Sequence, residues 1–185
     1  MEADWELEIG GDAHIIDACW EGFIDLRATP ERAVLFPEAR QLPGLVEALV
    51  RLNAPLSTFW TSKCDVWWPD KFDRDELDAD PEAGNNTLAC YIDLLPRTLR
   101  EWSVEEAIAA CTAICARLRS FPLRCCRADL IVRCAWVMQH RRDLGVTAYL
   151  TACGSNPEQA RATLQTALSC FAHAVLPPLC PSTLQ

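Results

Sequence analysis

Apolar and polar residues alternate with the period of a β-strand in several parts of the chain, most clearly in its last third. From Arg127 to Trp136 every second residue is apolar, and the alternation returns from Val146 to Cys153 after a polar stretch at 139–143. Two alternating segments joined by a short polar turn are typical of a β-hairpin. We therefore predict an antiparallel pair of strands here, with one apolar face and one polar face.

Other segments carry the same kind of signal. Alternating, β-branched and aromatic residues favour further strands at 5–9, 22–27, 59–68 and 88–95. The segment 69–87 contains seven acidic side chains, which favours a long solvated loop. The predicted strands therefore extend over most of the chain.

Three segments have the periodicity of an amphipathic helix instead. Residues 45–52 carry an apolar stripe. Ser103 and Glu106 form a capping box ahead of a second stripe, because each side chain can bond the other residue's backbone amide. Asn156 is a typical N-cap for a third helix, which is predicted to run to about Val175. We expect these three to be the main helices.

Residues 22–137 then follow the order strand, helix, strand, strand, helix, strand, which is the βαββαβ order of a ferredoxin-like fold. A chain of 185 residues fits a single domain, 1–185, with its core at 22–175 and a C-terminal tail at 177–185. We predict an α+β protein, a ferredoxin-like α/β sandwich with an extended antiparallel sheet and three main helices on one face. The alternative is a barrel-like sheet closed by dimerisation, with the polar face inside.

The charge balance excludes several classes of partner. With 17 basic and 26 acidic residues the net charge is −9, which repels phosphate backbones and anionic lipids. Nucleic acid and membrane surfaces are therefore not expected partners. No apolar run approaches the ~18 residues of a membrane span, and the acidic N-terminal residues do not resemble a secretory signal. We expect a cytoplasmic protein.

Eleven cysteines are many for such a protein. Cys111 and Cys115 fall within the apolar stripe of the second predicted helix, and the chain has no C-x-x-C pair typical of zinc sites. Buried thiols that pack as small apolar groups explain this pattern best. We expect no metal and no cofactor, and we keep a cysteine-dependent metal or redox role as the least favoured alternative.

No catalytic or ligand-binding motif is present. The acidic segment does not match a calcium-binding EF-hand, because a loop that begins at Asp73 has Asp78 where glycine is required and Gly84 where glutamate is required. The three histidines are far apart, and no glycine-rich phosphate loop or dinucleotide fingerprint occurs. The sequence therefore indicates no reaction.

The polar face of the predicted sheet is the surface best suited to binding. It combines charges of both signs with aromatic rings, contributed by Lys63, Asp65, Trp67, Tyr91, Asp93, Arg127, Asp129, Arg133 and Tyr149. Arginine can hold a carboxylate with two parallel hydrogen bonds. The adjacent Trp67 and Trp68 place a large ring on both sides of one strand. The same pattern also fits an ordinary solvated sheet face.

We therefore expect a non-enzymatic binding or accessory protein, which uses this open polar and aromatic face to engage a protein partner or a small polar ligand. The face would also allow two copies to pair as a homodimer. The first alternative is a small enzyme on the same face, with its acid or base among Lys63, Asp65, Asp93 and Asp129 and an anion held by Arg127 or Arg133.

Overall fold

The computed structural model describes residues 1–185 except 74, 78, 80–85, 99–100, 138–140 and 177–185. The strands are β1 (Glu2–Glu8), β2 (Ile16–Ala18), β3 (Phe59–Trp67), β4 (Asn86–Pro96), β5 (Cys126–Val137) and β6 (Arg141–Gly154). The α-helices are α1 (Pro37–Gln41), α2 (Pro43–Leu52), α3 (Val104–Arg119) and α4 (Pro157–Val175), with short 3₁₀ turns η1 (Pro30–Leu35) and η2 (Asp75–Leu77). The predicted tail and parts of the predicted acidic loop and hairpin turn lie outside the described residues.

The strands form one six-stranded mixed sheet in the order β1-β5-β6-β4-β3, with β2 beside the far end of β5. β5 and β6 are antiparallel neighbours, and Asp129 lies opposite Tyr149. The predicted α+β class and the C-terminal hairpin are thus confirmed. The expectation of a wholly antiparallel sheet is wrong, because both β1 and β2 run parallel to β5.

The sheet does not follow the ferredoxin-like order. That order places the first strand of the βαββαβ motif between the third and the fourth. Here β6 fills the position between β4 and β5, because the C-terminal hairpin pairs along its whole length. The strand predicted at 22–27 is also absent: this segment is irregular, and Asp25 accepts hydrogen bonds from Arg27. Bonding within the segment replaces pairing with a neighbouring strand.

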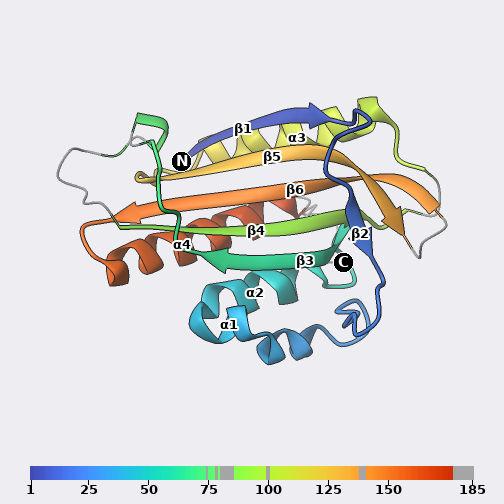
Figure 1. Ribbon diagram of the computed structural model, residues 1–185. Coiled ribbons are helices and arrows are strands. Elements are labelled where there is room, and N and C mark those ends of the chain that lie inside the picture. The colour runs from blue at the N-terminus through green and yellow to red at the C-terminus, as the bar shows by residue number, and fades with distance from the viewer. Residues whose placement is uncertain (74, 78, 80–85, 99–100, 138–140, 177–185) are drawn as a thin grey trace, which may run out of the picture.

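The helices cover one face of the sheet. In Figure 1, α3 and α4 lie behind the strands, and α2 lies below them, where it packs against α4 and β3. The capping box of Ser103 and Glu106 is formed, and Asn156 caps α4 as predicted. Gly154 leads into α4, and a Cβ at this position would collide with the backbone nitrogen of Ala160. None of the helices in the described part of the chain is long and apolar enough to cross a membrane.

Two apolar clusters hold this arrangement together. The larger lies between the sheet and the helices and includes Leu130, Leu164 and Phe171. The smaller lies on the other side of the sheet, where β2 packs its Ile16 against Trp60 of β3. Figure 1 shows β2 in front of the strands near one end of the sheet. The sheet face opposite the helices is therefore covered at one end by β2. At the other end η2, whose Leu77 is buried, contacts β5 and β6, and the part between these two segments is the open face.

A β-bulge in β3 decides which of its side chains reach this open face. The register with β4 shifts between Thr61, which pairs with Leu94, and Cys64, which pairs with Ile92. Strict alternation along β3 would place Thr61 and Lys63 on the same face of the sheet. Instead Thr61 points toward the helices, where it accepts a hydrogen bond from Asn53, whereas Lys63 lies on the open face above the Trp20 ring.

Candidate functional site

The open face is defined by alternate positions of five strands. The register places Lys63, Asp65 and Trp67 of β3 next to Tyr91 and Asp93 of β4. It continues through β6 to Arg127, Asp129 and Arg133 of β5, with Tyr149 of β6 between Tyr91 and Asp129. All nine candidate residues thus lie on this face. The alternation of β1 adds a row of acids beside β5: Glu2, Asp4, Glu6 and Glu8.

Three aromatic rings occupy the middle of the open face. The ring centroids of Trp67, Tyr91 and Tyr149 lie 6.0–6.3 Å from one another, from three adjacent strands. The Trp67 side chain is 36% exposed, and its neighbour Trp68, just beyond the end of β3, is 45% exposed. Aromatic rings at such spacing form a contact surface with little conformational freedom to lose, which suits association with another molecule.

Arg133 lies beside these rings and is almost fully buried, at 7% exposure. Its guanidinium lies 5.7 Å from the Tyr149 ring centroid and donates to the Tyr149 hydroxyl at 3.2 Å. It also donates to the Glu8 carboxylate at 2.7 Å. The cation is therefore satisfied within the chain, and Arg133 fixes the position of Tyr149 and Glu8.

Asp93 is the most buried acid of the open face among the described residues, at 3% exposure. Thr147 donates a hydrogen bond to its carboxylate at 2.7 Å. Burial raises the pKa of Asp93 above the ordinary value of 3.8, although the Thr147 bond and the nearby charges of His14, Lys63 and Arg133 oppose this. Ionisation of Asp93 therefore lowers the stability of the folded protein.

Replacing Asp93 with asparagine is expected to stabilise the protein at pH 7. Because the folded-state pKa is raised, stability falls as pH rises from near 3.8 through the pKa of the folded protein, and the Asp93→Asn variant should lack this loss. The free energy of unfolding at pH 7 should rise by more than ~0.5 kcal/mol, which is the size of the change that surface substitutions usually cause. Urea unfolding between pH 4 and 7 measures it, with the exposed Asp65→Asn as control. Lower stability of Asp93→Asn than wild type at pH 7 would contradict this account.

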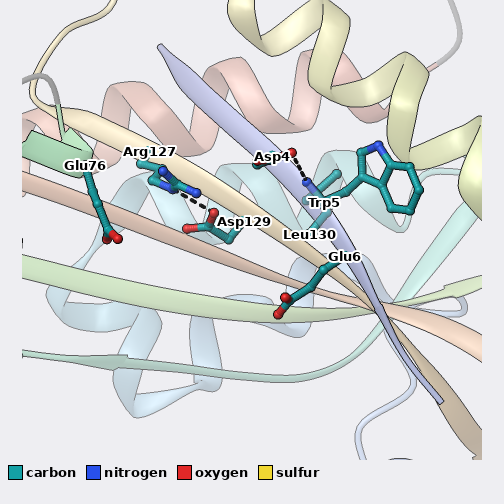
Figure 2. Close-up of a pocket in the computed structure, with 7 residues that line it drawn as sticks. All are labelled: Asp4, Trp5, Glu6, Glu76, Arg127, Asp129 and Leu130. Atoms are coloured by element: carbon teal, nitrogen blue, oxygen red, sulfur yellow. Dashed lines mark hydrogen bonds and ion pairs between the residues drawn. The ribbon is translucent and has the colours of Figure 1, made fainter. Parts of the chain in front are cut away.

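A second part of the face is a small acidic pocket of about 290 Å³, shown in Figure 2. Asp4 and Glu6 come from β1, Glu76 from η2, and Arg127 and Asp129 from β5. The Arg127 Nε atom donates to Asp129 at 2.7 Å, so the one cation among the described lining residues is already paired. The pocket therefore keeps an excess of carboxylates.

These carboxylates affect one another. Burial raises the pKa of Asp129, and the charges of Asp4 and Glu6 raise it further against the lowering effect of Arg127. Arg119 lies 3.7 Å from Asp4, but both side chains are more than half exposed, and such a pair contributes little. Glu6 forms no ion pair with any described residue. A positive group from another molecule would relieve this repulsion.

A third part is a pocket of about 500 Å³ at the β3 edge of the face. The segment after β2 supplies the apolar wall, including Trp20, Phe23 and Phe36, while Lys63, Asp65 and Tyr91 line the sheet side. The Lys63 ammonium lies 4.8 Å from the Trp20 ring centroid. Both side chains thus connect the candidate face to the segment that covers its end.

The candidate acids, bases and arginines are spread from β3 to β5, although the charges of Lys63 and Arg133 both act on Asp93. Lys63 and Asp65 lie on β3, whereas Arg127 and Asp129 lie on β5, with β4 and β6 between them. At the ordinary strand spacing the two groups are about 14 Å apart. Catalysis requires a nucleophile, acid or base within hydrogen-bond reach of one reacting group, and this spread suits an extended contact surface better.

The acids of β1 lie on the candidate face although the sequence pattern did not place them there. The alternation of Trp5 and Leu7 with Glu6 and Glu8 was sufficient to predict a strand, but its position beside β5 depends on a parallel pairing that no local pattern encodes. His14, whose charge acts on Asp93, lies between β1 and β2 and carries no sequence signal.

Several of the cysteines pack in the core, as the sequence predicts. Cys111, Cys115 and Cys126 are buried free thiols in the larger core cluster. Burial raises the pKa of the Cys111 and Cys126 thiols to about 12, which makes them poor nucleophiles at neutral pH. Among the described residues, no group of three or more histidines, cysteines and acids could hold a metal ion.

Comparison with known protein families, with curated proteins and with solved structures found no match for the chain.

Proposed function

We propose that the protein is a non-enzymatic binding protein whose open sheet face engages a positively charged protein partner. The observation that carries this proposal is the row of acids on β1, which has no matching row of available cations in the described part of the face. Glu2, Asp4 and Glu6 are exposed. The basic residues of the same face are engaged within the chain: Arg127 with Asp129, Arg133 with Glu8, and Lys63 above Trp20.

The remaining features of the face fit a protein interface. Exposed and half-buried aromatic rings next to charged groups resemble the anchor residues of such interfaces, which are enriched in tryptophan, tyrosine and arginine. Here Trp67, Tyr91 and Tyr149 supply the rings, and Arg133 is already held in place by Glu8 and Tyr149. The net charge of −9 would accelerate encounter with a basic partner, and high salt would weaken this effect.

Affinity capture followed by charge reversal tests this proposal. The immobilised protein is expected to retain a basic protein from cells of its source, and Glu6→Lys should weaken the affinity of the purified partner by about tenfold or more at low salt. The matched control is Glu47→Lys, because Glu47 is exposed on α2, on the helix side of the sheet. Equal loss of affinity in both variants, or capture of no basic protein, would contradict the proposal.

A further inference from the structure

A pocket separate from the open face lies on the helix side, between the start of β3, the end of β4 and the start of α3. Its volume is about 600 Å³, within the range of small-molecule sites. Phe59 and Trp102 form an aromatic wall, with their ring centroids 5.5 Å apart in an edge-to-face arrangement. Ala110 of α3 also lines the pocket. The pocket is thus wide enough for a small ring or a short aliphatic chain.

One guanidinium is fixed at the edge of this pocket. Arg97 donates from Nε to the Phe59 carbonyl at 3.1 Å and from Nη2 to the Asn53 carbonyl at 2.5 Å. Asn53 is itself held by Leu49 and Thr61 and is buried. The Arg97 head group therefore does not need to be ordered when a ligand binds, which reduces the entropic cost of binding.

Arg97 lacks a carboxylate partner among the described residues. Nearby Asp25 is bound by Arg27 through two guanidinium nitrogens. Glu106, the one acid among the described lining residues, accepts from the Ser103 backbone in the capping box. Burial and the neighbouring Arg27 charge lower the pKa of Arg97, and the Asp25 charge opposes this only in part, so the cation is incompletely compensated. Nη1 has no acceptor in the described part of the chain.

We propose that this pocket binds a small organic carboxylate with an apolar body. The carboxylate would accept hydrogen bonds from the Arg97 guanidinium, and the apolar body would lie against Phe59 and Trp102. A neutral ligand would leave the guanidinium unmatched, and a cation would be repelled by it. Ser57 and Thr58 also line the pocket, and their hydroxyl groups could donate to a carboxylate or to water bound to it.

An NMR titration with phenylacetate tests this inference. In the wild-type protein, phenylacetate is expected to shift the Trp102 indole N–H and the amides around Arg97, whereas phenylacetamide should bind about tenfold more weakly. Arg97→Gln should weaken phenylacetate binding by about tenfold or more, and Arg51→Gln on α2 should leave it unchanged. Ala110→Phe fills the pocket without altering its charge and should abolish binding.

Each outcome decides the question. No shift around the pocket in the wild type, equal affinity for phenylacetamide, or unchanged binding to Ala110→Phe would overturn the inference. Arg97→Gln also loses two bonds to backbone carbonyls, so its folding is checked by urea unfolding. If that variant does not fold, Ala110→Phe and the phenylacetamide comparison decide. Failure here leaves the proposed protein-binding face untouched, because the two surfaces share none of the described residues.

Discussion

Replacing Phe171 with alanine is expected to lower the free energy of unfolding by about 3–5 kcal/mol, a large share of the total for a domain of this size. Phe171 is 0% exposed and is among the largest fully buried side chains. It belongs to α4, which packs against β6, β4 and α2, so its removal leaves a cavity that several rigid elements border. The loss includes both the transfer free energy of the ring and the unfilled volume.

Urea unfolding followed by circular dichroism measures this change. Leu56→Ala is the control, because Leu56 is 81% exposed and its truncation removes little buried surface. We expect the control to remain within about 0.5 kcal/mol of the wild type. A Phe171→Ala protein that unfolds at the wild-type midpoint would contradict the packing of α4 described above.

Replacing Trp60 with alanine is expected to lower the free energy of unfolding by about 3–5 kcal/mol at most. Unlike the Phe171 substitution, it should also detach one surface segment from the sheet. Trp60 is the centre of the smaller cluster: it contacts Ile16 and Phe23, and the Arg27 guanidinium lies 4.1 Å from its ring centroid. These residues belong to the segment that covers one end of the open face. Loss of the ring should therefore release that segment before the main core unfolds.

Limited proteolysis separates local release from global unfolding. In Trp60→Ala, cleavage within residues 19–28 should accelerate while the helices remain protected. Trp60→Phe retains a ring and should restore most of the protection, and Trp136→Ala, at 47% exposure, should have little effect. Uniform cleavage along the chain at wild-type rates would show that the cluster does not hold this segment.

The local elements were predictable because their signals are local. The capping box at Ser103, the Asn156 cap and the alternation of β5 and β6 each depend on residues a few positions apart, and the structure has each of them. The candidate residues of β4, β5 and β6 also share one face, since the period of two determines this within any regular strand.

The long-range arrangement was not predictable from these signals. The parallel pairing of β1 with β5 joins residues more than a hundred positions apart, and it brings the acids of β1 to the candidate face. The bulge at Ser62 and Lys63 moved Thr61 to the helix side, where Asn53 provides a buried partner. The segment 22–27 has the composition of a strand, yet the Asp25–Arg27 pair and the Arg27–Trp60 contact fix it in another form.

Hydrogen–deuterium exchange of the complex with the captured partner tests the central claim most directly. If the open face is the binding surface, partner binding should slow exchange in β1 and in the exposed edge of β3, while exchange in α2 and α4 stays unchanged. Slower exchange confined to the helices, with β1 and β3 exchanging as in the unbound protein, would contradict the claim.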